Sequence, residues 1–273
     1  MSTSTTLLPN NFRLQPLAAL AKAEFRQLIR NRTLVFMGTV FPIGLPLLTF
    51  FIGRNSDDGA TAALTAAAME TFAMMALLFV QYYTVLSMVV TRRDEGVLKR
   101  LRTGEATDWQ LMSAPAVPGA LLTLVSTGAV AGVMYAFGAP APVNVIAIAL
   151  AIGTGIVVFA LLALATTTIT KNAEAAQITS LPVFVLAVAG MASIRDILPD
   201  NLARIADWTP FAAVSDLIHL GTSGLRFDAA DAATPLRFGE VFGEIGQPVA
   251  TMALWTALAL WMIVRSFRWD DRG

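Results

Sequence analysis

Charged side chains are most concentrated in residues 92–115, which read RRDEGVLKRLRTGEATDWQLMSAP and lie between apolar stretches. The part from Asp94 onward is compatible with a short helix, in which Glu95 precedes Lys99 by one turn, the favourable order for an ion pair. Three aliphatic residues form a ridge within it: Val97, Leu98 and Leu101. The other members of this predicted docking segment are charged, apart from one glycine: Asp94, Glu95, Gly96, Lys99, Arg100 and Arg102. An apolar centre inside a charged rim is typical of a protein–protein contact.

A second interpretation of the docking segment is a solvated loop whose basic residues only fix the orientation of the neighbouring membrane spans. That interpretation explains the basic residues, but it explains neither Asp94 and Glu95 nor the aliphatic ridge. If the segment docks a partner, we expect Gly96 to let the partner approach the backbone closely and the ridge to fill a groove on it.

Groups that could perform catalysis or bind a metal are few. The chain has no cysteine and one histidine, His219, so it offers neither a thiolate nucleophile nor a cysteine–histidine metal cluster. The run HLGTSGL at residues 219–225 is not the G-x-S-x-G nucleophile elbow. None of the lysines, Lys22, Lys99 and Lys171, follows a glycine, so the sequence contains no G-x-x-x-x-G-K-[ST] phosphate-binding loop. We therefore predict no catalytic residue, no metal site and no cofactor bound by this chain.

The composition is that of an integral membrane protein. Hydrophobic residues make up 56% of the 273 residues and charged residues only 14%, whereas a soluble domain carries about 25% charged residues. The mean hydropathy is +0.65. A formal net charge of zero gives no basic field for nucleic acid.

Six apolar stretches are long enough to cross a hydrocarbon core of about 30 Å, which takes about 20 helical residues. They lie at about 34–53, 67–91, 116–138, 145–169, 176–194 and 247–265. Backbone amides in lipid must be paired within the protein, so all six are predicted to be helices. Pro42 and Pro46 should kink the first helix, and Pro182 the fifth. The sequence therefore predicts an all-α membrane domain, residues 33–268.

Lysine and arginine placement predicts the orientation of the six spans. Of the 19 basic residues, 14 fall on the side that carries both termini and 5 on the opposite side. Because cytoplasmic loops carry the excess of Lys and Arg, both termini are expected in the cytoplasm, with the protein in the cell membrane. The first apolar run is too long for a signal peptide and is interpreted as an uncleaved span.

A basic amphipathic helix is predicted at residues 17–32, between a polar tail (1–16) and the first span. Lys22, Arg26 and Arg30 recur every four residues, and Phe25 falls on the apolar side. Such a helix suits the headgroup layer of the membrane, where it would contact lipid. Simple anchoring by positive charge is an equally good interpretation. Residues 266–273 are predicted to form a cytoplasmic tail.

The segment between the fifth and sixth spans, residues 195–246, is long for a loop. Thr209 can cap a helix that opens at Pro210. Four apolar residues then share one face of it: Phe211, Val214, Leu217 and Ile218. We expect short helices lying in or dipping into the outer interface. A disordered linker would expose this apolar face to water. Acidic residues make this side negative, which favours cationic amphiphiles but also follows from the positive-inside rule.

One face of the second span is a predicted substrate path. Its residues recur at three- and four-residue steps: Met74, Leu77, Gln81, Thr84 and Met88. Gln81 and Thr84 lie well inside the span and must face protein or a hydrated cavity, while the methionines suit varied apolar compounds. The alternative is a hydrogen bond from Gln81 to a neighbouring helix.

In the third span, Gly128 and Gly132 form a G-x-x-x-G pattern, which permits close approach of a second helix. Packing within one chain is the favoured interpretation of this pattern. Dimerisation is the alternative.

The stretch RRDEGVLKRLRTGEATDW resembles the segment after the second span of ABC-2 type transporter permeases, especially the drug-exporter branch typified by the daunorubicin permease. Members carry an acidic-Gly-aliphatic-Leu-basic-Arg-Leu run, matched here by residues 95–101. Many members continue with Ala-Thr-Pro, whereas this chain continues with Thr103-Gly104-Glu105. The resemblance extends over about the whole chain, from the basic amphipathic helix through six spans to the tail RSFRWDDRG.

This resemblance implies the transmembrane subunit of an ATP-binding cassette exporter of hydrophobic or amphiphilic, drug- or antibiotic-like compounds. It implies that residues 92–115 meet a separate ATPase subunit, of which two copies hold ATP and Mg²⁺. It also implies that two permeases pair, either as a homodimer or with a homologous permease.

Three other functions are alternatives to this one. An ABC-2 permease for a lipid or polysaccharide precursor differs only in cargo. An ATP-independent secondary transporter would show ionisable residues deep in its spans, and Glu70, near the outer end of the second span, is interpreted as interfacial. An intramembrane enzyme has only His219 and Ser223 in its favour.

Overall fold

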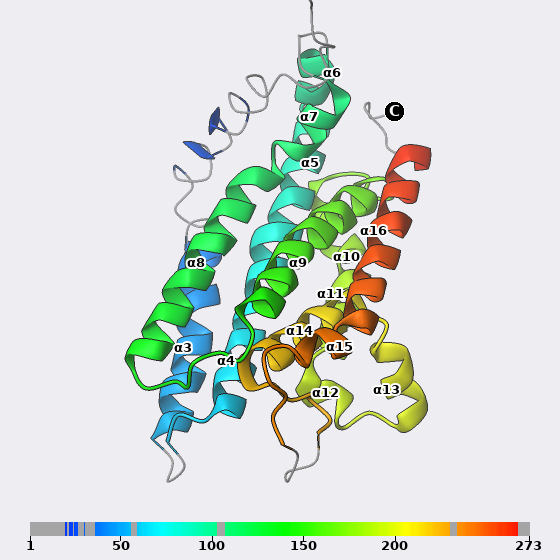
Figure 1. The fold of residues 1–273 in the computed structure, drawn as a ribbon. Coiled ribbons are helices and arrows are strands. Elements are labelled where there is room, and N and C mark those ends of the chain that lie inside the picture. Colours follow the sequence, from blue (N-terminus) through cyan, green and yellow to red (C-terminus); the bar gives the residue numbers. More distant parts are fainter. Residues whose placement is uncertain are drawn as a thin grey trace, which may run out of the picture.

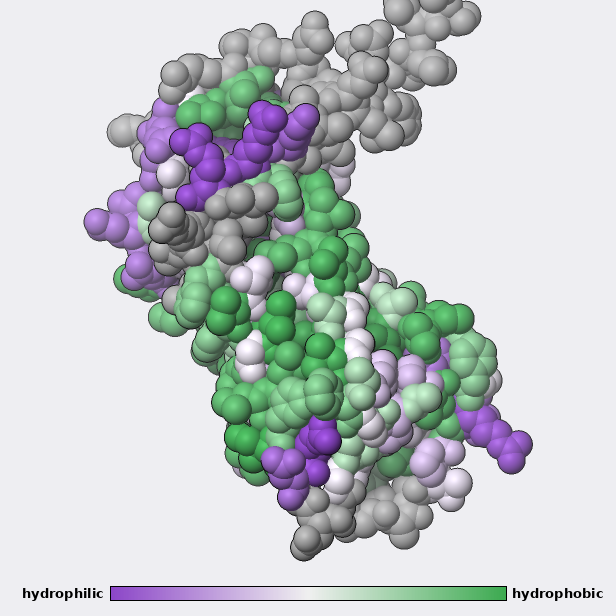
Figure 2. Space-filling model, turned by 90° about the vertical axis from the view of Figure 1, so that its left-hand side faces the viewer, coloured by the Kyte–Doolittle hydropathy of each residue, from purple (hydrophilic) through white to green (hydrophobic). Residues whose placement is uncertain are grey.

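The computed structural model describes most of the chain: residues 20, 22–23, 25–26, 30, 36–55, 59–102, 107–229 and 234–266. Every regular element in these ranges is helical. The long helices run up and down beside one another as a bundle (Figure 1). Apolar side chains cover the middle of one face of this bundle, and hydrophilic side chains gather toward its two ends (Figure 2).

Four helical stretches are long and apolar enough to cross a membrane: Ala62–Asp94, Ala116–Ala136, Val145–Thr167 and Gly246–Ser266. Two shorter apolar helices, Gly38–Arg54 and Ala173–Ala189, stand where the first and fifth spans were predicted. All six predicted stretches are therefore helical, and the all-α membrane fold is confirmed. Predicted span five ends earlier than expected, since its helix stops at Ala189.

The second stretch is one continuous helical run made of α4 (Ala62–Met75), η3 (Ala76–Tyr83) and α5 (Thr84–Asp94). The segment η3 is a π-helix, in which each backbone hydrogen bond joins residues five apart instead of four apart. The Thr84 hydroxyl follows this register and donates to the carbonyl oxygen of Phe79 at 2.9 Å.

Proline explains the irregular first and fifth stretches. The π-helix η2 (Phe36–Val40) directly precedes α3 (Phe41–Arg54), because Pro42 has no amide hydrogen for the carbonyl one turn earlier. Pro182 stands in the first turn of α11 (Leu181–Ala189), where its missing donor costs little, and Ser180 separates α11 from α10 (Ala173–Thr179). The third, fourth and sixth stretches are regular: α8 (Ala116–Ala136), α9 (Val145–Thr167) and α16 (Gly246–Ser266).

Side-chain caps begin several helices. Asn144 accepts from the amide of Ala147 at 3.0 Å at the start of α9. Thr209 accepts from the amide of Ala212 at 3.2 Å, and Pro210 is the first residue of α14 (Pro210–Ser223), as the sequence predicted. The remaining short helices are α6 (Val97–Arg102), α7 (Asp108–Ser113), α12 (Ala192–Arg195), α13 (Asp200–Ala206) and α15 (Val241–Glu244).

Helix α14 lies across the bundle at the end opposite α6 (Figure 1). It packs against α4, α9 and α16. The predicted apolar face is present, but it is directed into the protein rather than toward the membrane interface, since all four residues are fully buried: Phe211, Val214, Leu217 and Ile218. Helix α14 is therefore part of the core.

Glycines of α14 and α8 differ in how closely a neighbouring helix approaches them. A Cβ added to Gly221 of α14 would lie 2.6 Å from Cγ1 of Ile148 and 2.8 Å from the carbonyl oxygen of Asn144, so α14 touches α9 at this glycine. By contrast, a Cβ added to Gly128 or Gly132 would meet nothing within 4 Å. The prediction that the G-x-x-x-G pattern of α8 packs within the chain is therefore wrong for the described residues.

We expect Gly221→Ala to destabilise the fold, because its methyl group must push α14 away from α9; overpacking of this kind costs about 1–3 kcal/mol. Thermal unfolding of the purified protein, followed by tryptophan fluorescence, should show a lower midpoint. Gly128→Ala is the matched control and should keep the parental midpoint. Equal midpoints for both variants would contradict the close contact of α14 with α9.

Candidate functional site

The docking segment forms a tight reversal at the tip of the longest helix. Helix α5 ends at Asp94, the turn comprises Glu95 and Gly96, and α6 follows. Gly96 has φ of +66°, a left-handed conformation that residues with a side chain adopt at a cost. A role for Gly96 in close approach of a partner stays a prediction, whereas its role in the turn is evident from the backbone.

The aliphatic ridge of the docking segment is only partly on the surface. Leu98 is 2% exposed and belongs to the protein's own hydrophobic core, so it is not presented to a partner. Val97 and Leu101 are partly exposed, and Asp94 and Glu95 are exposed. The side chains of the remaining basic members lie outside the described residues: Lys99, Arg100 and Arg102.

An exposed tryptophan lies on the helix that packs beside α6 and was not assigned from the sequence. Trp109 lies on α7, which packs beside α6, and its side chain is 55% exposed. A capping box between Thr107 and Gln110 fixes the start of α7. Tryptophan is enriched among residues that dominate binding energy, so Trp109 extends the candidate docking surface.

The base of the docking segment is clamped to the turn between α9 and α10. Arg93 is buried, and its guanidinium donates to the carbonyl oxygens of Thr167 at 2.8 Å, Thr170, and Lys171 at 3.3 Å. Thr167 is the last residue of α9, and Thr170 and Lys171 lie in the turn after it, next to the C-terminal end of α9, where a positive charge is favourable. Asp94 accepts from the amide of Ala173, which opens α10, at 3.2 Å. The two residues fix the tip relative to both helices.

The predicted membrane-anchoring residues are described only one by one. Lys22, Phe25, Arg26 and Arg30 are all exposed. The rest of the predicted amphipathic helix, including its neighbours on the apolar face, lies largely outside the described residues.

The predicted substrate-path face does not form one uniform surface. Leu77 and Gln81 are fully buried and Met74 nearly so, while Thr84 and Met88 are partly exposed. The prediction used α-helical periodicity, and the π-helix η3 shifts the positions of side chains within it.

Gln81 makes the interhelical hydrogen bond that the sequence offered as an alternative. Its Nε2 donates to the carbonyl oxygen of Ala116, at the start of α8, at 3.4 Å. A Cβ at Gly119 would lie 2.8 Å from Oε1 of Gln81, so this glycine makes room for the amide. The substrate path itself stays a prediction.

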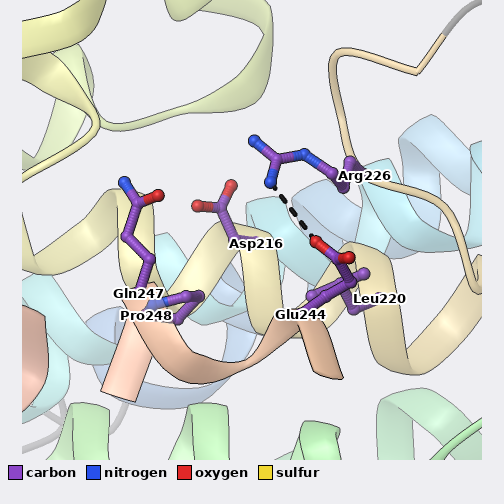
Figure 3. A pocket seen from close by; sticks show the side chains of 6 residues that line it. All are labelled: Asp216, Leu220, Arg226, Glu244, Gln247 and Pro248. Atoms are coloured by element: carbon purple, nitrogen blue, oxygen red, sulfur yellow. Dashed lines mark ion pairs between the residues drawn. The ribbon is translucent and has the colours of Figure 1, made fainter. Parts of the chain in front are cut away.

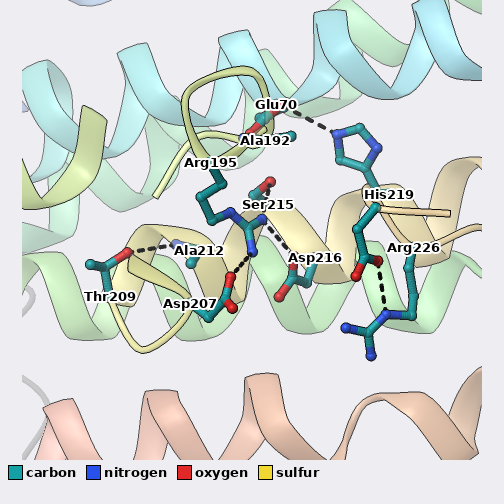
Figure 4. A network of polar contacts seen from close by, with 11 residues as sticks. Glu70, Ala192, Arg195, Asp207, Thr209, Ala212, Ser215, Asp216, His219 and Arg226 are labelled. Carbon is teal, nitrogen blue, oxygen red and sulfur yellow. Dashed lines mark hydrogen bonds and ion pairs between the residues drawn. The ribbon is translucent and has the colours of Figure 1, made fainter. Parts of the chain in front are cut away.

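A buried carboxylate connects α14 to the second stretch (Figure 4). Oε1 of Glu70 accepts from the amide of Ala192 at 2.7 Å, and Oε2 lies 3.2 Å from Nε2 of His219. The Glu70 side chain is 4% exposed, so the protein shields it from its surroundings, and its place at the membrane interface stays a prediction. No spacing pattern in the sequence indicates this pairing, because Glu70 and His219 are far apart in the chain.

A buried arginine connects α14 to α12 and to the residues just before α14 (Figure 4). Arg195 of α12 donates to Asp207 at 3.0 Å, to Ser215 at 3.2 Å and to Asp216 at 2.6 Å. Its guanidinium carbon lies 3.7 Å from the centre of the Phe227 ring. Burial raises the pKa of Asp216, and the charge of Arg195 opposes that rise.

A small polar recess lies beside this network, lined by Asp216, Leu220, Arg226, Glu244, Gln247 and Pro248 (Figure 3). Arg226 pairs with Asp228 at 3.0 Å and with Glu244 at 3.5 Å. Among the described residues, no group of three His, Cys, Asp or Glu side chains is arranged to hold a metal ion.

A family model described as "ABC-2 family transporter protein" matches residues 41–265, which run from α3 to the end of α16 and include the docking segment. No curated protein matches the chain. The match covers well over half of the sequence. The chain therefore belongs to the ABC-2 family of transporter proteins, whose members are the membrane permease components of ABC transporters and normally work with an ATPase partner.

Proposed function

We propose that this chain is the permease of an ATP-binding cassette exporter that moves a hydrophobic or amphiphilic compound, of the drug or antibiotic type, out of the cytoplasm. The daunorubicin-type branch of the family is the assignment that the docking segment supports. The observation that carries the proposal is the clamped helical tip formed by α5, α6 and α7.

The length of the second stretch supports a docking role for this tip. Ala62–Asp94 has 33 residues, whereas the other three long spans have 21 to 23. At 1.5 Å per residue this helix is about 50 Å long, and the hydrocarbon core is about 30 Å thick. Its ends must therefore extend beyond the hydrocarbon or tilt strongly within it. In the proposed orientation the tip extends into the cytoplasm, where an ATPase subunit can reach it.

The proposed assembly contains two ATPase subunits and two permeases in the cell membrane. The ATPase subunits hold ATP and Mg²⁺, because this chain has no phosphate-binding loop. The second permease is another copy of this chain or a homologous permease. Both chain termini face the cytoplasm, in accord with the positive-inside distribution of lysine and arginine.

One observation favours a second candidate, an ATP-independent transporter driven by protons. Glu70 and His219 are an ionisable pair buried at the end of a span, and such residues often relay protons. Transport into vesicles distinguishes the two. The exporter requires the ATPase and ATP, and the proton-driven transporter requires a pH gradient instead.

The purified chain alone should not hydrolyse ATP, because it lacks a loop that can bind the phosphates. Release of inorganic phosphate should stay at the level of an empty-detergent blank and should rise when the partner ATPase is added. Sustained ATP hydrolysis by the chain free of any second subunit would contradict the assignment of ATP hydrolysis to a separate ATPase subunit.

Val97→Asp should weaken binding of the ATPase subunit, because it places a charge in the partly exposed ridge. Loss of an anchor at an interface costs about 1.4 kcal/mol or more, which is about tenfold in Kd. The measurement is titration of the ATPase onto the reconstituted permease, together with coupled export.

Ile197→Asp is the matched control, because Ile197 is an aliphatic residue 75% exposed at the other end of the bundle. This variant should bind the ATPase as the parent does. Leu98→Asp is unsuitable because Leu98 is buried. Parental affinity and export for Val97→Asp would show that the ridge is not the docking surface.

Thr84→Cys and Met88→Cys should react with a small water-soluble thiol reagent, and bound cargo should protect them, because these members of the path face are partly exposed. The chain has no native cysteine, so mass spectrometry detects each product directly. Leu77→Cys is the buried control and Val125→Cys, 70% exposed on α8, the lipid-facing control. Failure of both test positions to react would remove this face from the pathway.

A further inference from the structure

Arg93 is buried in a different way from Arg195. Arg195 pairs with two carboxylates. Arg93 is 5% exposed, and among the described residues its guanidinium bonds only to the carbonyl oxygens of Thr167, Thr170 and Lys171, while its Nε has no partner. A buried charge without a carboxylate is unfavourable, and an apolar side chain of similar volume would fill the same place at a lower free energy. The value of Arg93 therefore lies in the elements that it joins.

These elements are the end of α5, the end of α9 and the start of α10. Asp94 adds a bond to the amide of Ala173, and α10 packs against α5. We call the four hydrogen bonds made by Arg93 and Asp94 the clamp. The clamp holds α10 and the last residue of α9 to the base of the docking tip.

Helix α10 is not continuous with the rest of the fifth stretch. Ser180 separates α10 from α11, and Pro182 lacks a backbone donor at this junction. Beyond the junction, the ring centre of Phe184 lies 5.4 Å from that of Phe79 and 6.2 Å from that of Tyr82, both in η3. Helix α11 also packs against α14. The clamp thus holds α10 to the tip, the core holds α11, and the junction between them is a place where α10 can tilt.

We propose that Arg93 and Asp94 are positioning residues, which make α10 and the end of α9 follow the docking tip when an ATPase subunit binds it. A force applied at α6 reaches α5 directly, and the clamp passes it to the two neighbouring helices. The junction at Ser180 and Pro182 lets α10 respond without moving α11. This inference rests on the proposed function, because it takes the tip as the docking surface, and it adds a role in coupling to the predicted role in docking.

The test is hydrogen exchange of the full chain in nanodiscs, resolved to single amides, with and without the partner ATPase and a non-hydrolysable ATP analogue. Two regions are compared: the tip, residues 97–102, and helix α10, residues 173–179. In the parent we expect the ATPase to slow exchange of the tip and to change exchange of α10 by about threefold or more. This measurement requires no transported compound.

Arg93→Gln removes the guanidinium and leaves Val97 and Trp109 in place. The ATPase should still slow exchange of the tip, whereas the response of α10 should fall to about a third of the parental value or less. Arg265→Gln is the matched control, because it removes the charge of an exposed arginine in the last turn of α16, and it should keep the parental response. A response of α10 that persists in Arg93→Gln would show that the ATPase covers α10 directly, and it would overturn the proposal.

Asp94 gives a second test, in which no buried side chain is changed. Asp94→Leu removes the acceptor, so the amide of Ala173 should exchange about fivefold faster, and α10 should respond less to the ATPase. Asp94→Asn keeps a side-chain oxygen that can accept the same bond, and it should restore both properties. Equal exchange and equal response in the two variants would overturn the role assigned to Asp94.

Failure of the docking surface and failure of the clamp give different results. If the ATPase slows exchange of neither the tip nor α10 in the parent, the proposed docking function is refuted, and the positioning role with it. If the ATPase slows exchange of the tip but α10 of the parent does not respond, the positioning role is refuted and the docking surface stands.

Discussion

Two buried charges hold helix α14 beneath the long helices, and the arrangement of that end of the bundle depends on them. An uncompensated charge in a protein interior is strongly destabilising, so the partners of Glu70 and Arg195 must stay in place. Glu70 binds the backbone amide of Ala192 at the start of α12 and the ring of His219 in α14. Arg195 binds the carboxylates of Asp207 and Asp216. Helix α14 is thereby bound to α4 through Glu70 and to α12 through Arg195.

The opposite end of the bundle is fixed by a different device. Arg93 donates to the carbonyl oxygen of Thr167, the last residue of α9, and Asp94 accepts from the amide of Ala173, the first residue of α10. The same helical run carries Glu70 near one end and Arg93 at the other, so one element joins the two fixed ends. The π-helix η3 lies between them. Interruptions of this kind are common at functional sites and where helices bend.

Features that depend on a local pattern, such as the positions of helices, could be predicted from the sequence. Features that depend on a second element packing against the first, such as burial and pairing, could not. Hydropathy located all six helical stretches, and Thr209 with Pro210 located the start of α14. Leu98 is buried and Val97 is partly exposed. No local pattern distinguishes them, because both are aliphatic residues of α6 and the burial of Leu98 depends on the elements packed against it. The glycines of α8 permit close packing, but a pattern cannot supply the neighbouring helix. Glu70 and His219 are separated by too many residues for any spacing rule to join them.

In the proposed function, the extra length of the second stretch is what provides a place for a docking surface on so apolar a chain. A helix matched to the hydrocarbon ends among lipid headgroups, where a partner protein would compete with the membrane surface. A run of 33 residues has about 20 Å to spare. In the proposed orientation, that excess carries α6 and Trp109 beyond the hydrocarbon on the cytoplasmic side. Arg93 and Asp94 tie the end of α5 to the last residue of α9 and to the start of α10, at the base of this tip.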